Sequence, residues 1–315
     1  MVSMGEAVRS KSARYKVNRG FEIFCIITTS VSLLVLGVLL FSIFRAGLEH
    51  LDWDFLSSYP SRTPEKAGFK AALVGSLWIC AVCAAVAIPL GVGTAVYLEE
   101  FAPKNKLTSF IQINISNLAA VPSVVYGLIG LTAFARMWGV IGENANDMAY
   151  GIGTPEDWYY FKLPFGFSVL TGGLTLMLVI LPVVIISSQE AIRAVPLSLK
   201  QGAGALGASR WQAVAKIVLP SAIPGIMTGS ILAMSRAIGE AAPVLVCGGA
   251  LFLTFTPENI MDSFTAMPLQ IFNWAGRPQE EFQRVASSGI VVLLVVLLSF
   301  NAAAVVIRSK FRKQM

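Results

Sequence analysis

Six long apolar runs, separated by shorter polar stretches, set the hydropathy pattern of this chain. A helix needs about 20 apolar residues to cross a bilayer, and each run is longer than that. Prolines interrupt several runs, which spanning helices tolerate because neighbouring groups satisfy the freed backbone. The pattern predicts an all-α membrane protein with six transmembrane helices, at residues 21–44, 69–98, 107–138, 165–188, 221–247 and 284–307.

The whole chain, residues 1–315, is expected to form a single transmembrane domain. Residues 1–20 form a basic tail, residues 21–47 carry the first span, and residues 69–308 form a five-span core with a polar loop at 189–219. The first apolar run exceeds the about 7–15 residues of a signal peptide, so we expect it to be retained. A short helix at the membrane interface is expected near Met267–Trp274.

The chain is 55% hydrophobic and 13% charged, whereas a soluble domain has about 25% charged residues. Its net charge of +6 would fit nucleic-acid binding, but the distribution of charge gives another explanation. One set of segments carries 15 Lys and Arg, and the other carries 4, together with 12 acids. The basic segments are 1–20, 99–106, 189–219 and the C-terminal tail, and the acidic ones are 48–68, 140–164 and 251–283.

Cytoplasmic loops of membrane proteins carry the excess of Lys and Arg. The charge distribution therefore predicts that both termini and the loop at 189–219 face the cytoplasm, and that the acidic segments lie outside. The excess of basic residues is explained by the orientation of the chain in the membrane, and we expect no nucleic-acid partner.

The polar loop after the fourth span contains residues that typically end helices. Pro196 and Pro220 limit it, and the residues between them predict a short helix at Leu197–Ala205, a break at Gly207 and a second short helix at Arg210–Val218. Its glycines also match the dinucleotide-binding fingerprint. No strand precedes them and no βαβ unit surrounds them, so that reading is disfavoured.

A charged pair lies inside the fifth apolar run. Arg236 and Glu240 are four residues apart, and therefore share one face of a helix. A charge near the middle of a span costs at least about 2.5–3.5 kcal/mol, so such residues usually face an interior or a watery path. We predict a polar translocation path that includes Ser235, Arg236 and Glu240; alternatively, the pair only fixes helix packing. Gly225-x-x-x-Gly229 predicts close helix packing nearby.

The loop at 189–219 resembles the coupling loop of ABC importer permeases. The family pattern is matched in spacing by Gln201-Gly202-Ala203, Gly207, Ile217, Leu219 and Pro220, although Gln201 and Gly202 replace the usual Glu-Ala. The resemblance implies a coupling helix that sits in a groove of a separate ATPase. The residues it assigns to this loop are Arg193, Leu199, Gln201, Gly202, Ala203, Leu206, Gly207, Ile217, Leu219 and Pro220.

Other stretches resemble the PstA family of phosphate permeases. They are Ser235 to Pro243, Tyr59 to Arg62, Ala87 to Gly93, Tyr97 to Pro103 and Val121 to Gly127. The resemblance implies a type I ABC importer permease architecture (a MetI-like fold) that forms half of a path for inorganic phosphate. It also implies a bacterial or archaeal plasma membrane, a second permease subunit (PstC-like), an ATPase dimer (PstB-like) that binds the ATP, and a phosphate-binding protein (PstS-like).

Other functional classes fit less well. An ion-coupled secondary transporter that uses Glu240 would be expected to carry inverted repeats, and none is evident. A second alternative, an ABC permease for a different oxyanion, is equally compatible with the residues. The single histidine provides no metal cluster or catalytic constellation, and no Gly-x-x-x-x-Gly-Lys-Ser/Thr motif occurs. We therefore expect a transport subunit that is not an enzyme and holds no cofactor or metal of its own.

Overall fold

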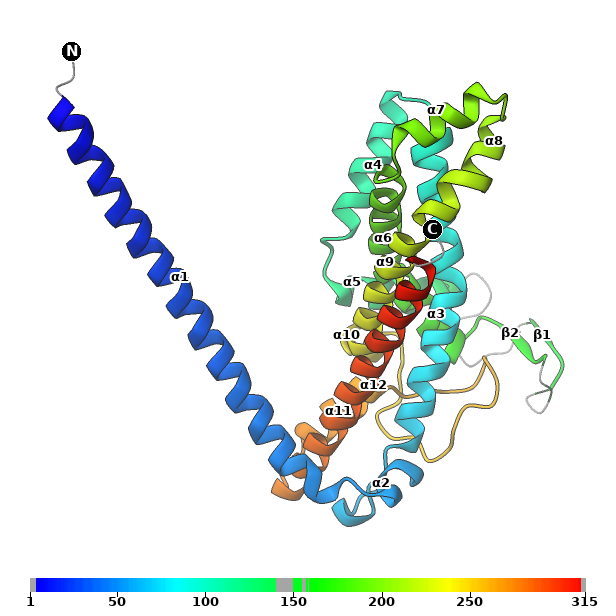
Figure 1. Cartoon of the computed structure of the whole chain (residues 1–315). Coiled ribbons are helices and arrows are strands. Elements are labelled where there is room, and N and C mark those ends of the chain that lie inside the picture. The colour runs from blue at the N-terminus through cyan, green and yellow to red at the C-terminus, as the bar shows by residue number, and fades with distance from the viewer. Residues whose placement is uncertain (1–3, 140–149, 155–156, 158, 313–315) are drawn as a thin grey trace.

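The computed structural model describes residues 4–139, 150–154, 157 and 159–312, and most of it is helical. Figure 1 shows α3, α6, α9 and α12 side by side in one bundle, with α1 leaning away from it. The long helices are α1 (Met4–Gly47), α3 (Lys70–Val96), α6 (Val169–Arg193), α9 (Leu219–Gly239) and α12 (Glu280–Arg312). The short ones are α2 (Trp53–Ser57), α4 (Lys106–Leu118), α5 (Ser123–Gly130), α7 (Leu197–Ala205), α8 (Arg210–Ala213), α10 (Ala242–Val246) and α11 (Met267–Ala275).

Within the described residues, five continuous helical segments are long and apolar enough to cross a membrane. The pair α4 and α5 makes a sixth if it is counted as one span, so the predicted six-helix architecture is confirmed on that count. The five segments are Asn18–His50, Lys70–Phe101, Val169–Arg193, Arg210–Gly239 and Glu280–Ala303.

The third span is not the continuous helix predicted for residues 107–138. The chain bends by 103° between α4 and α5. Pro122 is the physical reason, because a proline ring clashes with the carbonyl of the residue four positions earlier, and α4 ends at that residue, Leu118. The buried Tyr126 donates its hydroxyl to the carbonyl of Leu118 at 2.8 Å, which helps to hold the bend.

The fifth span also breaks where the sequence predicted continuity to Cys247. Helix α9 ends at Gly239, Glu240 is extended (φ −80°, ψ 115°), and α10 begins at Ala242. Pro243 again disfavours a helical carbonyl four residues earlier, which is that of Gly239. Figure 1 places α10 about halfway along the bundle, so the break lies well inside it.

Close contacts between small residues hold α6 against its neighbours. A Cβ atom at Gly225 would lie 2.7 Å from the Cβ of Ala191, and one at Gly229 would overlap the side chain of Ser187. The predicted close packing at Gly225 and Gly229 is therefore confirmed. Gln112 of α4 and Gln189 of α6 exchange two amide hydrogen bonds, at 2.9 and 2.8 Å, which join the broken span to the bundle.

Two elements of the segments predicted to lie outside differ from expectation. A two-stranded antiparallel hairpin, β1 (Tyr150–Ile152) with β2 (Phe161–Leu163), occurs in a chain that was predicted to be all-α. Residues 140–149 of the same predicted loop lie outside the described residues.

The expected short helix is present as α11, but much of it is buried, and the ring of Trp274 packs 5.6 Å from that of Phe69. Helix α11 is therefore packed into the core of the bundle.

Candidate functional site

The polar loop at 189–219 contains the first of its two predicted helices. Helix α7 has the predicted bounds, Leu197–Ala205. It ends in a Schellman motif, in which Ala208 N–H donates to Ala203 O and Gly207 N–H donates to Gly204 O, both at 3.0 Å. Gly207 has φ +80°, a conformation that favours glycine. The local sequence thus fixes the direction in which the chain leaves α7.

The second predicted helix of the loop is not separate. Helix α8 continues through a π-helical segment, Val214–Val218, directly into α9, so Pro220 lies within one helical segment instead of ending the loop. Proline is tolerated inside a spanning helix where a local π adjustment satisfies the freed backbone groups, and the π-helical segment ends two residues before Pro220. A capping box missed at the sequence level, Ser209 with Gln212, starts this segment.

The predicted coupling residues divide into an exposed tip and a buried base. Leu206 is 91% exposed, and Leu199, Gln201 and Gly202 are exposed as well. Ala203 is instead buried and faces the chain's own fold. At the base, Ile217 and Pro220 are half-buried, and Leu219 packs against a small core formed by Ala95, Ile192, Val195, Val218, Ala222 and Ile226. The large exposed apolar residues of this loop are Leu197, Leu199, Leu206 and Trp211.

Two ion pairs hold the loop to the end of α3. Glu99 accepts from Arg193, the last residue of α6, at 2.5 Å, and Glu100 pairs with Lys200 of α7. Sequence reasoning noted Glu99 and Glu100 only as part of a resemblance. Their partners are about 100 residues away along the chain, so no local pattern could assign them.

Phe101 extends the same contact to the third element of the loop. The guanidinium of Arg210 lies 5.6 Å from the centre of the Phe101 ring, and the Trp211 ring lies 6.2 Å from it. A groove of about 1310 Å³ runs beside this contact, between the turn after α3, the start of α4 and the two arginines Arg193 and Arg210.

Arg236 and Glu240 come together at the break in the fifth span. Arg236 stands in the last turn of α9, and its Nε lies 3.1 Å from Oε1 of Glu240. The pair forms although Glu240 has left the helix. The side chain of Arg236 is 48% exposed and that of Glu240 is 19% exposed. The guanidinium therefore has room for a further partner, whereas the carboxylate is mostly enclosed.

Ser235 does not join this pair. Its hydroxyl donates to the side-chain oxygen of Asn301 on α12 at 2.6 Å. This bond ties α9 to α12 directly beside Arg236. Sequence analysis missed Asn301, although a single Asn within a long apolar run is a signal that a polar partner faces it.

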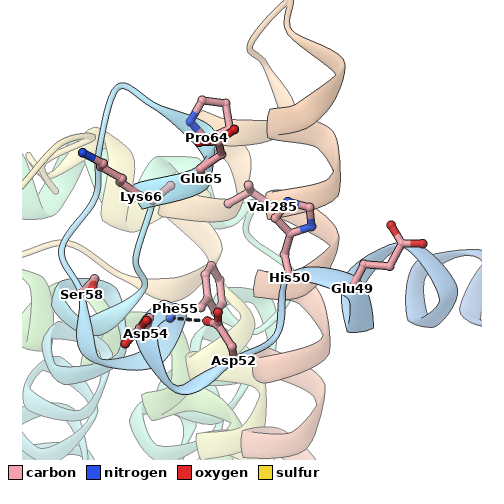
Figure 2. A pocket seen from close by; sticks show the side chains of 11 residues that line it. Glu49, His50, Asp52, Asp54, Phe55, Ser58, Pro64, Glu65, Lys66 and Val285 are labelled. Atoms are coloured by element: carbon pink, nitrogen blue, oxygen red, sulfur yellow. Dashed lines mark hydrogen bonds between the residues drawn. The ribbon is translucent and has the colours of Figure 1, made fainter.

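A separate pocket of about 400 Å³ opens at the far end of the bundle from α7. Figure 2 shows His50 and Val285 on one wall, Pro64 and Glu65 above them, and Asp52 with Phe55 below, where Asp52 accepts the backbone N–H of Phe55 at 2.7 Å. The walls come from segments predicted to lie outside. Their charged residues are mostly acidic, which gives the pocket a chemistry suited to a cationic group. Those residues are Glu49, Asp52, Asp54, Glu65 and Lys66.

The chain thus forms a helical bundle with breaks in the third and fifth spans and an exposed helical loop. The family model described as "binding-protein-dependent transport system inner membrane component" matches residues 87–313, and the chain belongs to this family of ABC importer permeases. It is 34% identical to the probable ABC transporter permease protein YqgI of Bacillus subtilis over 272 residues, which are 82% of this chain and 83% of YqgI.

Several relatives carry a more specific name. The chain is 32% identical over 242 residues to the phosphate transport system permease protein PstA 1 of Mycobacterium tuberculosis, which covers 76% of this chain and 70% of the relative. Among solved structures, a bacterial alginate ABC transporter has a similar chain, with a TM-score of 0.63 at 14% identity over 93% of this chain and 97% of that one. The MetNI methionine transporter gives a TM-score of 0.55 at 15% identity over 77% and 97%. These likenesses show the type I ABC importer permease fold.

Proposed function

We propose that this chain is one permease subunit of an ATP-driven importer of inorganic phosphate. It would form half of the translocation path and couple to a separate ATPase. Relatives named as phosphate permeases support the choice of substrate. The observation that carries the proposal is Arg236, a half-exposed cation held at a break inside the bundle.

Arg236 suits the passage of an anion. A fixed cation offsets part of the cost of taking phosphate out of water. The last turn of a helix is also a favourable place for a cation, because the helix dipole is negative there. Glu240 holds the guanidinium when the path is empty, and so limits how tightly the anion is bound. The path would alternate between an Arg236–Glu240 pair and an Arg236–phosphate contact.

The exposed tip of the 189–219 loop suits a protein partner. Large apolar side chains exposed on a polar loop mark an interaction surface. Leu206 and Trp211 are 91% and 66% exposed. We assign this surface to a PstB-like ATPase dimer, which would bind ATP, since this chain carries no motif for it. Ala203 is buried and would support the shape of α7 without contacting the ATPase.

The remaining surfaces suit two further partners. Helix α1 and the exposed face of α4 carry many uncovered apolar side chains, which would face lipid and a PstC-like permease subunit. The outer segments hold 12 acids and 4 basic residues and would repel free phosphate. Delivery of the anion by a docked PstS-like binding protein would overcome this repulsion. With this orientation, both termini lie on the cytoplasmic side of a bacterial or archaeal plasma membrane.

The test is transport by the purified four-component complex in proteoliposomes. Phosphate uptake that needs ATP inside and phosphate-loaded binding protein outside would support the proposal. Uptake driven by a proton gradient without ATP would instead indicate a secondary transporter that uses Glu240. ATP-dependent uptake of sulfate without uptake of phosphate would retain the permease function and change its oxyanion.

A further inference from the structure

Three consecutive residues in the helical turn that directly follows α3 each contact a different element of the coupling loop. Glu99 pairs with the last residue of α6, Glu100 pairs with α7, and Phe101 packs against the start of α8. We call Glu99, Glu100 and Phe101 the clasp. These contacts link the loop to a helix that precedes it by about 100 residues, so they are a feature of the tertiary fold and not of the loop itself.

The backbone of the clasp is unusual. Residues Tyr97–Phe101 form a π-helical turn, which closes with a 2.7 Å hydrogen bond from Ala102 N–H to Tyr97 O. Such turns are rare and occur often at functional sites. Consecutive residues of a helical turn point in different directions, so Glu99, Glu100 and Phe101 can reach separate elements.

The charges of the clasp are unfavourable for α3 alone. Two carboxylates at the C-terminal end of a helix face the negative end of its dipole, which is unfavourable. A basic residue would suit that position better. The two acids are therefore explained by their partners, Arg193 and Lys200, and not by the stability of α3.

The pair between Glu100 and Lys200 is the more protected of the two. The side chains of Glu100 and Lys200 are 11% and 26% exposed, whereas the side chain of Arg193 is 58% exposed. Water and salt screen an enclosed pair much less than an open one. Glu100 and Lys200 should therefore stay together when α7 moves, while Glu99 and Arg193 can separate more easily.

From these contacts we propose that the clasp transmits movement of α7 to α3, with Glu100 and Lys200 as the positioning pair. This inference rests on the proposed function, in which α7 is the helix that the ATPase moves. Without the pair, no ion pair would join α7 itself to the turn after α3, and only Glu99 and Phe101 would still link that turn to the ends of α6 and α8. With it, α3 moves as well, and α3 packs along α6, where Gly173 lies against Val82. Helices α3 and α9 would then both move in response to one contact with the ATPase.

A charge swap tests the positioning pair in the complete complex. The variants are Lys200→Glu, Glu100→Lys and the two together, with Lys216→Glu as the matched control, because Lys216 is exposed on the same loop and forms no ion pair among the described residues. Each single variant should still assemble and hydrolyse ATP, but phosphate uptake per ATP should fall about tenfold or more. The double variant should recover to within about threefold of the unaltered complex, and the control should remain unchanged.

The result of the swap is decisive in either direction. If the single variants transport as well as Lys216→Glu does, or if the double variant does not recover, the proposed pairing is overturned. Where a charge reversal prevents assembly, Lys200→Gln and Glu100→Gln replace it, and they should lower the same ratio without reducing assembly. A merely structural pair would instead lower the amount of complex and leave uptake per ATP unchanged.

A second measurement does not depend on phosphate. In a Cys25→Ser background, a cysteine is placed at exposed Lys104, just after the clasp, and its rate of maleimide labelling is measured with and without ATP and vanadate. The trapped state should change the rate about threefold or more in the otherwise unaltered complex, and this change should vanish with Lys200→Glu and return with the double swap. If the change persists in Lys200→Glu, the clasp does not transmit movement. If labelling behaves as expected but phosphate is not transported, the proposed substrate fails and the clasp stands.

Discussion

Replacement of Arg236 by glutamine should slow transport strongly while leaving the fold nearly intact. The ion pair with Glu240 is worth little to stability, because Arg236 is 48% exposed and exposed pairs at this spacing contribute about 0.3–0.5 kcal/mol. Glu240 is only 19% exposed, and leaving it without its partner adds about 1–2 kcal/mol. The loss should lower the thermal midpoint by only a few degrees.

The expected effect on transport is larger. A cation about 4 Å from a singly charged anion contributes about 4 kcal/mol at the effective dielectric constant of a protein surface. Because about half of Arg236 is exposed, we halve this value to about 2 kcal/mol, which corresponds to a roughly 30-fold lower rate. Uptake of radioactive phosphate into proteoliposomes measures the rate, and co-purification of the ATPase shows that the variant is assembled.

The matched control is Arg284→Gln. Arg284 also pairs with a glutamate, Glu49, at 3.9 Å, but both side chains are exposed, and Glu49 lines the pocket at the far end of the bundle from α7. This control should transport normally. Arg236→Lys keeps the charge without the planar fork and should retain partial activity. Glu240→Gln should bind phosphate more tightly and release it more slowly. Normal transport by assembled Arg236→Gln and Glu240→Gln would show that the pair only fixes packing.

Three further predictions concern packing, docking and topology. Gly229→Leu should reduce the yield and thermal stability of the purified subunit, because the new side chain would overlap Ser187; normal values would refute the packing seen between α6 and α9. Leu206→Asp should leave insertion unchanged and weaken co-purification of the ATPase, as its side chain is almost fully exposed; undiminished recovery of the ATPase would remove this residue from the docking surface. Reporter fusions should be cytoplasmic after Ile307 and external within 140–164, and the reverse pattern would overturn the orientation.

Local chemistry made the bounds of α7 predictable. Pro196 limits α7 at its start and Gly207 ends it, and both act through backbone geometry that depends on a few adjacent residues. Prolines also lie at the breaks in the third and fifth spans, but those breaks were not predicted from them. Pro122 and Pro243 each stand four residues after the end of a helix, whereas Pro89 and Pro182 lie within continuous ones. Proline alone does not distinguish these outcomes, because the surrounding packing decides whether the freed carbonyl is accommodated.

Long-range partners could not be predicted. The i, i+4 spacing indicated the contact between Arg236 and Glu240, and the structure contains it. The partners Lys200 for Glu100 and Asn301 for Ser235 depend on how α3, α7, α9 and α12 pack, and a single sequence contains no record of that packing. Exposure could not be predicted either, because nothing in the sequence of this loop distinguishes buried Ala203 from exposed Leu206.

The attachment of α1 has a consequence for how the subunit is built into a membrane. This helix touches the bundle mainly near its last residue, where Gly47 lies against the backbone of Ser287 and accepts a 2.8 Å hydrogen bond from Ser288. None of the apolar window of this span is covered by the rest of the chain. The tilt of α1 is therefore set by what surrounds the subunit, and α1 can rotate about the close contact at Gly47. An isolated subunit should show many orientations of α1, and one orientation should dominate only after assembly.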